Sequence, residues 1–228
     1  MTSAKQIYLG VRRGAPTPPL PYDAEVEYLE STGTQWIDTG CRAGYETVVD
    51  VRCAWMRYSA DEAVISMDEG TATSNSFTLE YVSYNRWGIL LAFGSGNASI
   101  GYTFCRSFVK PSLGEFYDIN SSKTGLTFGG ETYVRTPPPS EFVCAYPLLM
   151  FTYGRRGEAI IPSMVRISHL TIRDNDTAVR DYQAVRFTNE QGVSEGAMYD
   201  RVSGQLFRNA GTGAFKFGTD IAGGGVNG

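Results

Sequence analysis

The sequence predicts an all-β protein built as a two-sheet antiparallel sandwich. Its 228 residues include 26 Gly, 14 Tyr and 12 Phe, a composition that favours strands and tight turns. After Tyr22 there is no helical periodicity of useful length, whereas short runs of β-branched and aromatic residues recur between turn signals. About a dozen such runs at this spacing are typical of two packed sheets.

The predicted strands can be placed in order along the chain. The early ones are 48–55, 63–67, 76–81 and 86–93, and the later ones are 116–119, 126–128, 131–134 and 148–151. The clearest hairpin spans 126–133, because Gly129 and Gly130 stand where a tight turn requires positive φ.

One predicted strand must be irregular. In 165–172 the apolar residues change parity between Ile167 and Leu170. A strict period-2 strand that faces one core cannot do this, so we expect a β-bulge near Ser168 and His169. Further on, 199–207 should form a strand, a turn and a strand, with Asp200 and Ser203 capping the turn instead of taking part in catalysis.

The chain divides into an N-terminal arm (1–21), a sandwich (22–219) and a Gly-rich tail expected to be flexible (220–228). Four prolines between Pro16 and Pro21 favour an extended spacer, which separates a short strand at 6–11 from the body. A lone strand must pair with something. We therefore expect the arm to dock either on a partner chain or on a sheet edge, through Ile7, Tyr8, Leu9 and Val11.

Charge and hydropathy narrow the range of partners. The net charge is -4, the pI is about 5.1, and no run of Lys or Arg is present. A protein that neutralises phosphates needs a basic surface, so nucleic acid is an unexpected partner. No stretch approaches the ~20 apolar residues of a membrane span, and 1–10 is too polar for a secretion signal. We expect neither a membrane association nor an export signal.

The residues that could bind metals or form disulfides are sparse. The four cysteines are far apart and lack zinc-site spacing, so we expect free thiols and keep disulfides as the alternative. These cysteines are Cys41, Cys53, Cys105 and Cys144. His169 is the single histidine and is assigned a structural role. Acidic residues at 61–62, 68–69 and 174–176 could supply a Ca²⁺ site, although carboxylates are common in surface turns. No cofactor and no metal is predicted.

Two segments carry a resemblance to a known family. Residues 25–40 (EVEYLESTGTQWIDTG) closely resemble the "EYIESTGTQYIDTG" opening of a family of phage, prophage and gut-bacterial proteins. Residues 179–186, 196–207 and 209–213 resemble its closing pattern, "LVRDFIPVR…GLYDKVSGKLF.NAGTG", with Tyr182 for Phe and Gln183-Ala184 for Ile-Pro. The resemblance spans about 22–219 and implies a concanavalin A-like or laminin-G-like jelly roll.

The resemblance also implies a function. Residues 5–11 (KQIYLGV) are similar, more weakly, to the "KKIYVGV" openings of phage structural proteins. Together the two similarities imply a virion component: a fibre, decoration or tail-associated protein. We expect it to contact other virion proteins through its arm, to form a homo-oligomer and to have host-surface glycans as its candidate ligand. A secreted or surface carbohydrate-binding protein of a gut bacterium is the alternative.

The opening motif also has a physical interpretation. Gly33 and Gly40 stand where turns need a missing Cβ, and Thr32 and Thr34 can bond local backbone groups. Trp36 and its neighbour Ile37 supply apolar anchors. A structural motif that closes the fold is therefore preferred over a ligand site.

Catalysis is not expected. Glu25, Glu27 and Glu30 resemble the Glu-x-Asp-x-x-Glu strand of bacterial β-glucanases, in which the outer carboxylates are nucleophile and acid/base. However, Glu27 replaces the central Asp, and the triplet lies in the first strand and belongs to the non-catalytic family's own opening. No phosphate-binding loop, nucleophile elbow or His-Glu-x-x-His motif is present. A glycoside hydrolase is kept as the minor alternative.

Aromatic clusters are the natural equipment for binding sugars, because a pyranose stacks its C–H face on a ring. The densest cluster follows Tyr81, and Trp55 with Tyr58 forms another. The alternative is that these rings fill the core, since a strand exposes every second residue. The predicted ligand-binding residues are Tyr84, Asn85, Arg86 and Trp87.

Overall fold

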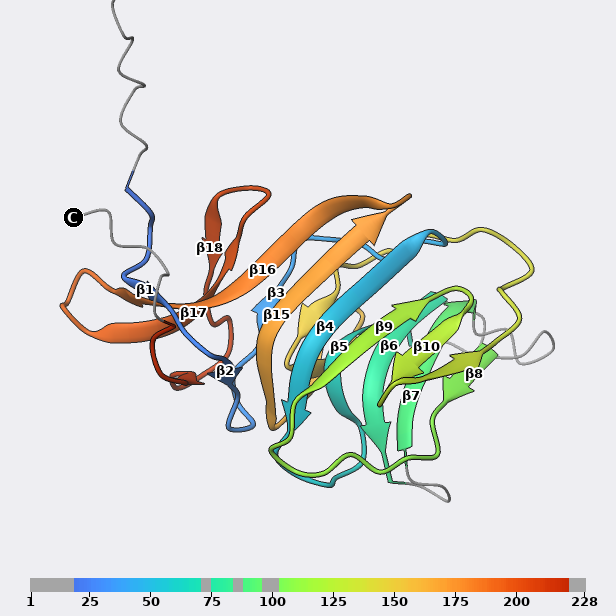
Figure 1. The fold of residues 1–228 in the computed structure, drawn as a ribbon. Helices are drawn as coiled ribbons and strands as arrows, with labels where there is room; N and C mark the ends of the chain where they lie inside the picture. Colours follow the sequence, from blue (N-terminus) through green and yellow to red (C-terminus); the bar gives the residue numbers. More distant parts are fainter. Residues whose placement is uncertain (1–18, 71–74, 84–87, 96–102, 222–228) are drawn as a thin grey trace, which may run out of the picture.

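The fold is a β-sandwich, as the sequence predicts (Figure 1). The computed structural model describes residues 19–70, 75–83, 88–95 and 103–221. Within these residues nineteen strands form an 11-stranded and an 8-stranded sheet. In the same residues no helix is long and apolar enough to span a bilayer.

The larger sheet has eight strands on its main path and three short ones beside it. Strand β1 pairs with β16, while β2 pairs with both β15 and β19. The main path runs β11 (Glu131–Val134), β10 (Gly125–Phe128), β9 (Tyr117–Ser122), β4 (Thr47–Trp55), β15 (Val165–Asp174), β16 (Thr177–Thr188), β17 (Ser194–Asp200) and β18 (Gln205–Phe207); the short strands are β1 (Ala24–Glu25), β2 (Leu29–Glu30) and β19 (Lys216–Phe217).

The smaller sheet faces the larger one across the core. Its pairs are antiparallel except for one parallel pairing, Arg155 with Asp68. Strand β12 (Leu149–Met150) pairs with β3 (Ile37–Asp38) and with β5. The order is β14 (Glu158–Pro162), β13 (Thr152–Arg155), β5 (Glu62–Asp68), β6 (Asn75–Val82), β7 (Gly88–Ser95) and β8 (Thr103–Arg106).

The space between the sheets is filled by large side chains. Trp55 and Tyr81 are fully buried, so these two rings belong to the core and not to a sugar-binding surface. Tyr58 lies half-buried beside Tyr81, and its hydroxyl donates to Pro111 O at 2.7 Å. Burying one side chain of this size contributes about 1.5–3 kcal/mol, so the core dominates the stability of the fold.

The four cysteines are unpaired. Cys53, Cys105 and Cys144 are buried, and Cys41 is half-buried. Burial raises the pKa of the Cys144 thiol to about 12, which keeps it protonated and unreactive at neutral pH.

The predicted irregular strand is confirmed. The register of β15 against β4 shifts between Ile167 and His169, so Ser168 is the extra residue of a bulge. Ile167 and Leu170 both face the core as a result. The predicted hairpin is confirmed too, with φ of 61° at Gly129 and 82° at Gly130 between β10 and β11.

The two family-like segments bind each other, and we call this contact the clasp (34–36 with 209–212). The Thr34 hydroxyl donates to Thr212 O at 2.8 Å, and Thr212 N donates to Thr34 O at 3.0 Å. Ala210 N donates to Trp36 O at 2.8 Å, and Trp36 N donates to Asn209 Oδ1 at 3.2 Å. Gly211 fits because a Cβ there would lie 2.1 Å from Thr34 O.

The clasp corrects one expectation from the sequence. Thr34 bonds a residue 178 positions away, not a local backbone group. The local turn is held mainly by Gln35, whose Oε1 accepts the Thr32 N–H at 2.7 Å. Gly33 and Gly40 do adopt positive φ, 100° and 65°, as predicted.

The two ends of the described chain lie together. The Val26 backbone bridges to Asp220, and Ile221 N donates to Glu25 O at 2.9 Å. The Asp220 carboxylate also accepts two hydrogen bonds of 2.7 Å from Arg186 in β16. Asp220 and Ile221, which the sequence assigned to the tail, are therefore bonded to the sandwich.

Replacing Gly211 by Ala should weaken the clasp. Because the added methyl group would meet the Thr34 carbonyl and the Trp36 ring, we expect the free energy of unfolding to fall by about 3 kcal/mol. Urea unfolding followed by tryptophan fluorescence measures this. The control is Gly129→Ala, where no atom lies within 4 Å of the new Cβ. There the left-handed backbone alone should lower the free energy of unfolding by about 1 kcal/mol. Equal losses in the two variants would contradict the clasp's role.

Candidate functional site

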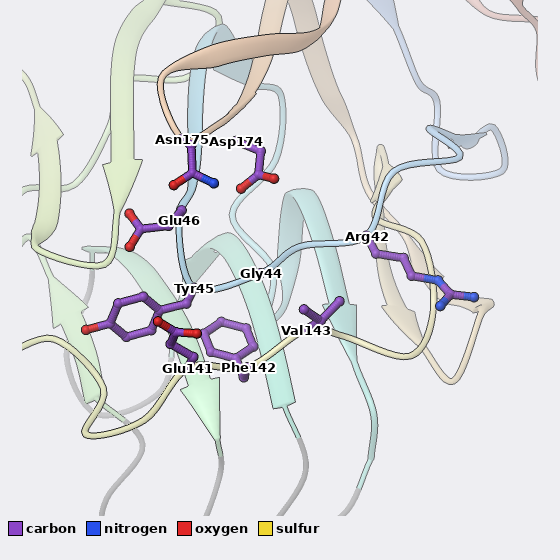
Figure 2. Close-up of a pocket in the computed structure, with 9 residues that line it drawn as sticks. All are labelled: Arg42, Gly44, Tyr45, Glu46, Glu141, Phe142, Val143, Asp174 and Asn175. Atoms are coloured by element: carbon purple, nitrogen blue, oxygen red, sulfur yellow. The ribbon is translucent and has the colours of Figure 1, made fainter.

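Three loops of the described chain meet at a cleft of about 620 Å³, which we take as the candidate site (Figure 2). The first loop precedes β4, the second precedes β12, and the third is the turn between β15 and β16. The residues that line the cleft are Arg42, Gly44, Tyr45, Glu46, Glu141, Phe142, Val143, Asp174 and Asn175.

Backbone hydrogen bonds hold the first two loops against each other. Tyr45 N donates to Phe142 O at 2.9 Å, and Cys144 N donates to Ala43 O at 2.8 Å. The third loop is a tight turn in which Asn175 and Asp176 have φ of 47° and 63°. Asn tolerates this left-handed backbone better than most residues, which explains its place at the rim.

Two aromatic rings form the floor of the cleft. Phe142 is buried and packs edge-on against Phe93, with ring centroids 5.2 Å apart. Tyr45 is half-buried, and the ammonium group of Lys123 lies 4.3 Å from its ring centroid. In Figure 2 the Glu141 carboxylate is drawn between the two rings, and the Glu46 carboxylate lies above them.

The charges at the cleft are mostly negative. Glu46, Glu141 and Asp174 contribute carboxylates, and the guanidinium of Arg42 points away from them in Figure 2. Glu46 forms an ion pair with Lys123, and this hydrogen bond raises the pKa of the lysine. The cleft therefore offers hydrogen-bond acceptors beside aromatic surface, which suits a hydroxyl-rich ligand and disfavours an anion.

The sequence-predicted ligand residues cannot be compared with this cleft. Tyr84, Asn85, Arg86 and Trp87 lie outside the described residues, as do the predicted arm residues Ile7, Tyr8, Leu9 and Val11. The chain connectivity alone shows that 84–87 joins β6 to β7.

The structure places the outer carboxylates of the glucanase resemblance in two short strands. Glu25 lies in β1 and Glu30 in β2, so they do not share one strand. Glu25 forms an ion pair with Arg201 at 3.2 Å, and Glu30 forms one with Arg166 at 2.7 Å. Each of the two carboxylates is thus paired with an arginine.

The Asp200 side chain caps a turn, as the sequence predicts. It is completely buried, and its Oδ1 accepts the backbone N–H of Asp181 at 2.8 Å and of Val202 at 3.1 Å. Its Oδ2 accepts the Ser203 hydroxyl at 2.6 Å and the Ser203 N–H at 3.2 Å. The buried carboxylate holds β16 to the turn that follows β17.

Two further acidic residues from the sequence analysis accept hydrogen bonds within the chain. Asp68 accepts the Tyr153 hydroxyl at 2.6 Å, and Glu69 accepts the Ala145 N–H at 2.6 Å. His169 pairs with Asp181 at 2.6 Å on the outer face of the larger sheet. Across 19–70, 75–83, 88–95 and 103–221, no group of three His, Cys, Asp or Glu side chains is placed to hold a metal ion.

Sequence reasoning did not find the cleft residues Tyr45, Glu46, Glu141 and Phe142. They stand in loops about a hundred positions apart and belong to no motif. The only local signal is that an aromatic residue adjoins a glutamate in both loops, which is too common a pattern to predict a site.

No protein-family model matches this chain, and no curated protein matches its sequence.

Replacing Asp200 by Asn tests its structural role. The amide nitrogen cannot accept the two Ser203 hydrogen bonds, so we expect the free energy of unfolding to fall by about 2–3 kcal/mol. The matched variant Ser203→Ala removes one of these bonds and should cost about 1 kcal/mol. Chemical denaturation of both proteins measures the difference. A D200N protein as stable as the wild type would show that the carboxylate is not needed for the turn.

Proposed function

We propose that this chain is a non-enzymatic virion protein of a phage, a fibre, decoration or tail-associated component that presents a lectin-like jelly roll and binds host-surface glycans. The proposal rests on the family-like opening and closing segments and on the sandwich fold. It includes a homo-oligomer anchored through the N-terminal arm to other virion proteins.

The observation that carries the proposal is that the strand by which the chain enters the sandwich, β1, lies far from the cleft along β16. The chain enters the sandwich at β1, which pairs with Arg186 and Val185 near one end of β16. The cleft lies at the other end of β16, beside the Asp174–Asn175 turn. Strand β16 has 12 residues, which span about 40 Å at roughly 3.3 Å per residue. Figure 1 shows β1 and the turn between β15 and β16 near opposite ends of β16. An anchor N-terminal to β1 would therefore hold the cleft away from the particle surface.

The bonding of the family-like motifs favours a binding protein over an enzyme. The conspicuous polar side chains of these motifs bond within the chain, in the clasp and in the Asp200 turn. The glycoside hydrolase alternative has less support, because Glu25 and Glu30 lie in different strands and each balances an arginine. A sugar would find acceptors and rings in the cleft instead.

The cleft also suits the second candidate, a surface or secreted carbohydrate-binding protein of a gut bacterium. That protein would need the same ligand site but no docking on a particle. The arm therefore distinguishes the two candidates.

Deleting the arm should prevent incorporation into particles. The deletion should remove residues 1–18 only, because Tyr22 packs on Tyr199 with ring centroids 4.9 Å apart and belongs to the sandwich. Quantitative mass spectrometry of purified particles should show at least a tenfold lower copy number. The control removes 222–228. Unchanged incorporation of the arm deletion would overturn the virion anchor.

Replacing Asn175 by Gly should weaken glycan binding by several-fold. Glycine accepts the positive φ of this position, so the substitution removes the amide from the cleft and keeps the turn. Asp176→Gly is the matched control, since Asp176 has the same backbone but does not line the cleft. The measurement is the retention of each protein on host cells. A Tyr84→Ala, Trp87→Ala double variant is measured in the same way, because both residues belong to the ligand-binding cluster predicted from the sequence. Full retention by every variant would contradict glycan adhesion.

A further inference from the structure

The hairpin of β13 and β14, at the edge of the smaller sheet, carries two adjacent arginines. Arg155 pairs with Glu158, and Arg156 and Gly157 form the two-residue turn between them. Both arginines are exposed. Together with Glu158 and Ile160 they line another cleft, of about 410 Å³.

The backbone of Arg156 has a conformation that arginine does not favour. Its φ is 55°, and that of Gly157 is 83°. Two-residue hairpin turns with positive φ at both positions normally have Asn or Asp before the Gly, because these short polar side chains tolerate the left-handed region. An arginine here costs folding free energy, and local strain of this kind is typical of functional positions.

The two guanidinium groups converge on the loop that follows β5. Arg155 Nη2 donates to Gly70 O at 2.9 Å, and Arg156 Nη2 donates to the same oxygen at 3.4 Å. Arg156 Nε also donates to Glu69 O at 3.3 Å. Gly70 leaves room for both side chains, since a Cβ there would lie 2.5 Å from Arg155 Nε and 3.0 Å from Arg156 Nε. The two positive charges therefore lie close together.

The neighbouring carboxylates do not neutralise this pair. Arg155 Nε approaches Asp68 Oδ2 only to 4.0 Å, and that carboxylate already accepts two other hydrogen bonds, of 2.6 and 2.7 Å. Both oxygens of Glu69 accept backbone N–H groups. In the part of the chain that the structure describes, Arg156 and Glu158 form no ion pair.

The remaining guanidinium N–H groups suit an oxyanion. A guanidinium has five N–H groups in a planar fork, and the backbone carbonyls accept from one of Arg155 and two of Arg156. The others can donate in pairs to the oxygens of a phosphate or a carboxylate. Ile160, which is 49% exposed, adds apolar surface to the cleft, and the Tyr146 ring lies against Gly157 beside it. Apolar surface next to an anion site suits a charged sugar better than an inorganic ion.

We propose that Arg155 and Arg156 bind the oxyanion group, a phosphate or a carboxylate, of an acidic sugar whose ring rests on Ile160. The proposal rests on the proposed function for the source of this sugar, a host-surface glycan, and adds a charged group to it. The site is separate from the cleft of Figure 2, whose carboxylates disfavour an anion. The net charge of -4 disfavours a polyanion such as nucleic acid, whereas two arginines suffice for one anionic group.

The test is a titration of the full-length protein, followed by ¹H–¹⁵N NMR of the arginine Nε–H groups. Glucose, glucuronate and glucose 6-phosphate are the probes, because they share one ring and differ in the group at C6. We expect at least one of the two anions to shift the signals of Arg155 and Arg156 and to bind at least about fivefold more tightly than glucose. The anion that binds more tightly identifies the group on the glycan as a carboxylate or a phosphate.

The variant Arg156→Asn separates binding from stability. Because asparagine tolerates the left-handed turn better, the urea midpoint should stay equal or rise, while the affinity for the better anion should fall at least about tenfold. Glu158→Gln removes a repelling carboxylate from the cleft and should raise that affinity about twofold. Lys216→Gln removes one positive charge from β19 in the larger sheet and is the control, which should change neither quantity.

Equal binding of all three probes, or no binding of either anion, would overturn the proposal. Unchanged anion binding in Arg156→Asn would overturn it too, and a lower urea midpoint in that case would give Arg156 a structural role instead. Failure of this site leaves the proposed function to its own tests, which are the copy number in particles and the retention of the Asn175→Gly protein on host cells.

Discussion

The sandwich depends on a contact between residues that are far apart in the chain. The clasp joins Thr34, Gln35 and Trp36 to residues 209–212 through five hydrogen bonds. Closing a loop of 178 residues costs roughly 4–5 kcal/mol of chain entropy, while five hydrogen bonds contribute about 5 kcal/mol. The hydrogen bonds therefore roughly offset the entropy cost of closing the loop, and the burial of the neighbouring Ile37 adds a net stabilisation.

Two buried carboxyl groups differ in how far the fold satisfies them. Asp200 is fully buried, and its two oxygens accept four hydrogen bonds from within the chain. Glu80 is almost as buried, yet one of its oxygens has no partner within the described residues. The polar groups of the family-like segments thus satisfy one another within the fold.

Much of the fold could be predicted from the sequence, because the signals for it are local. The Gly129-Gly130 turn follows from backbone geometry, and the bulge at Ser168 follows from the change of parity in the apolar pattern. Short strands such as β2 and β19 could not be predicted, since two residues carry no periodicity. The partner of Thr34 was missed because a hydroxyl group bonds equally well to near and distant carbonyls.

The sequence by itself determined the fold class, the hairpin, the bulge and the structural character of the opening motif. Only the tertiary structure decided which distant residues meet: Tyr45 with Phe142 at the cleft, and Thr34 with Thr212 at the clasp. The physical reason is that periodicity specifies which face of its own strand a residue occupies, whereas the register between strands decides its neighbours. That register is set by the packing of the whole core.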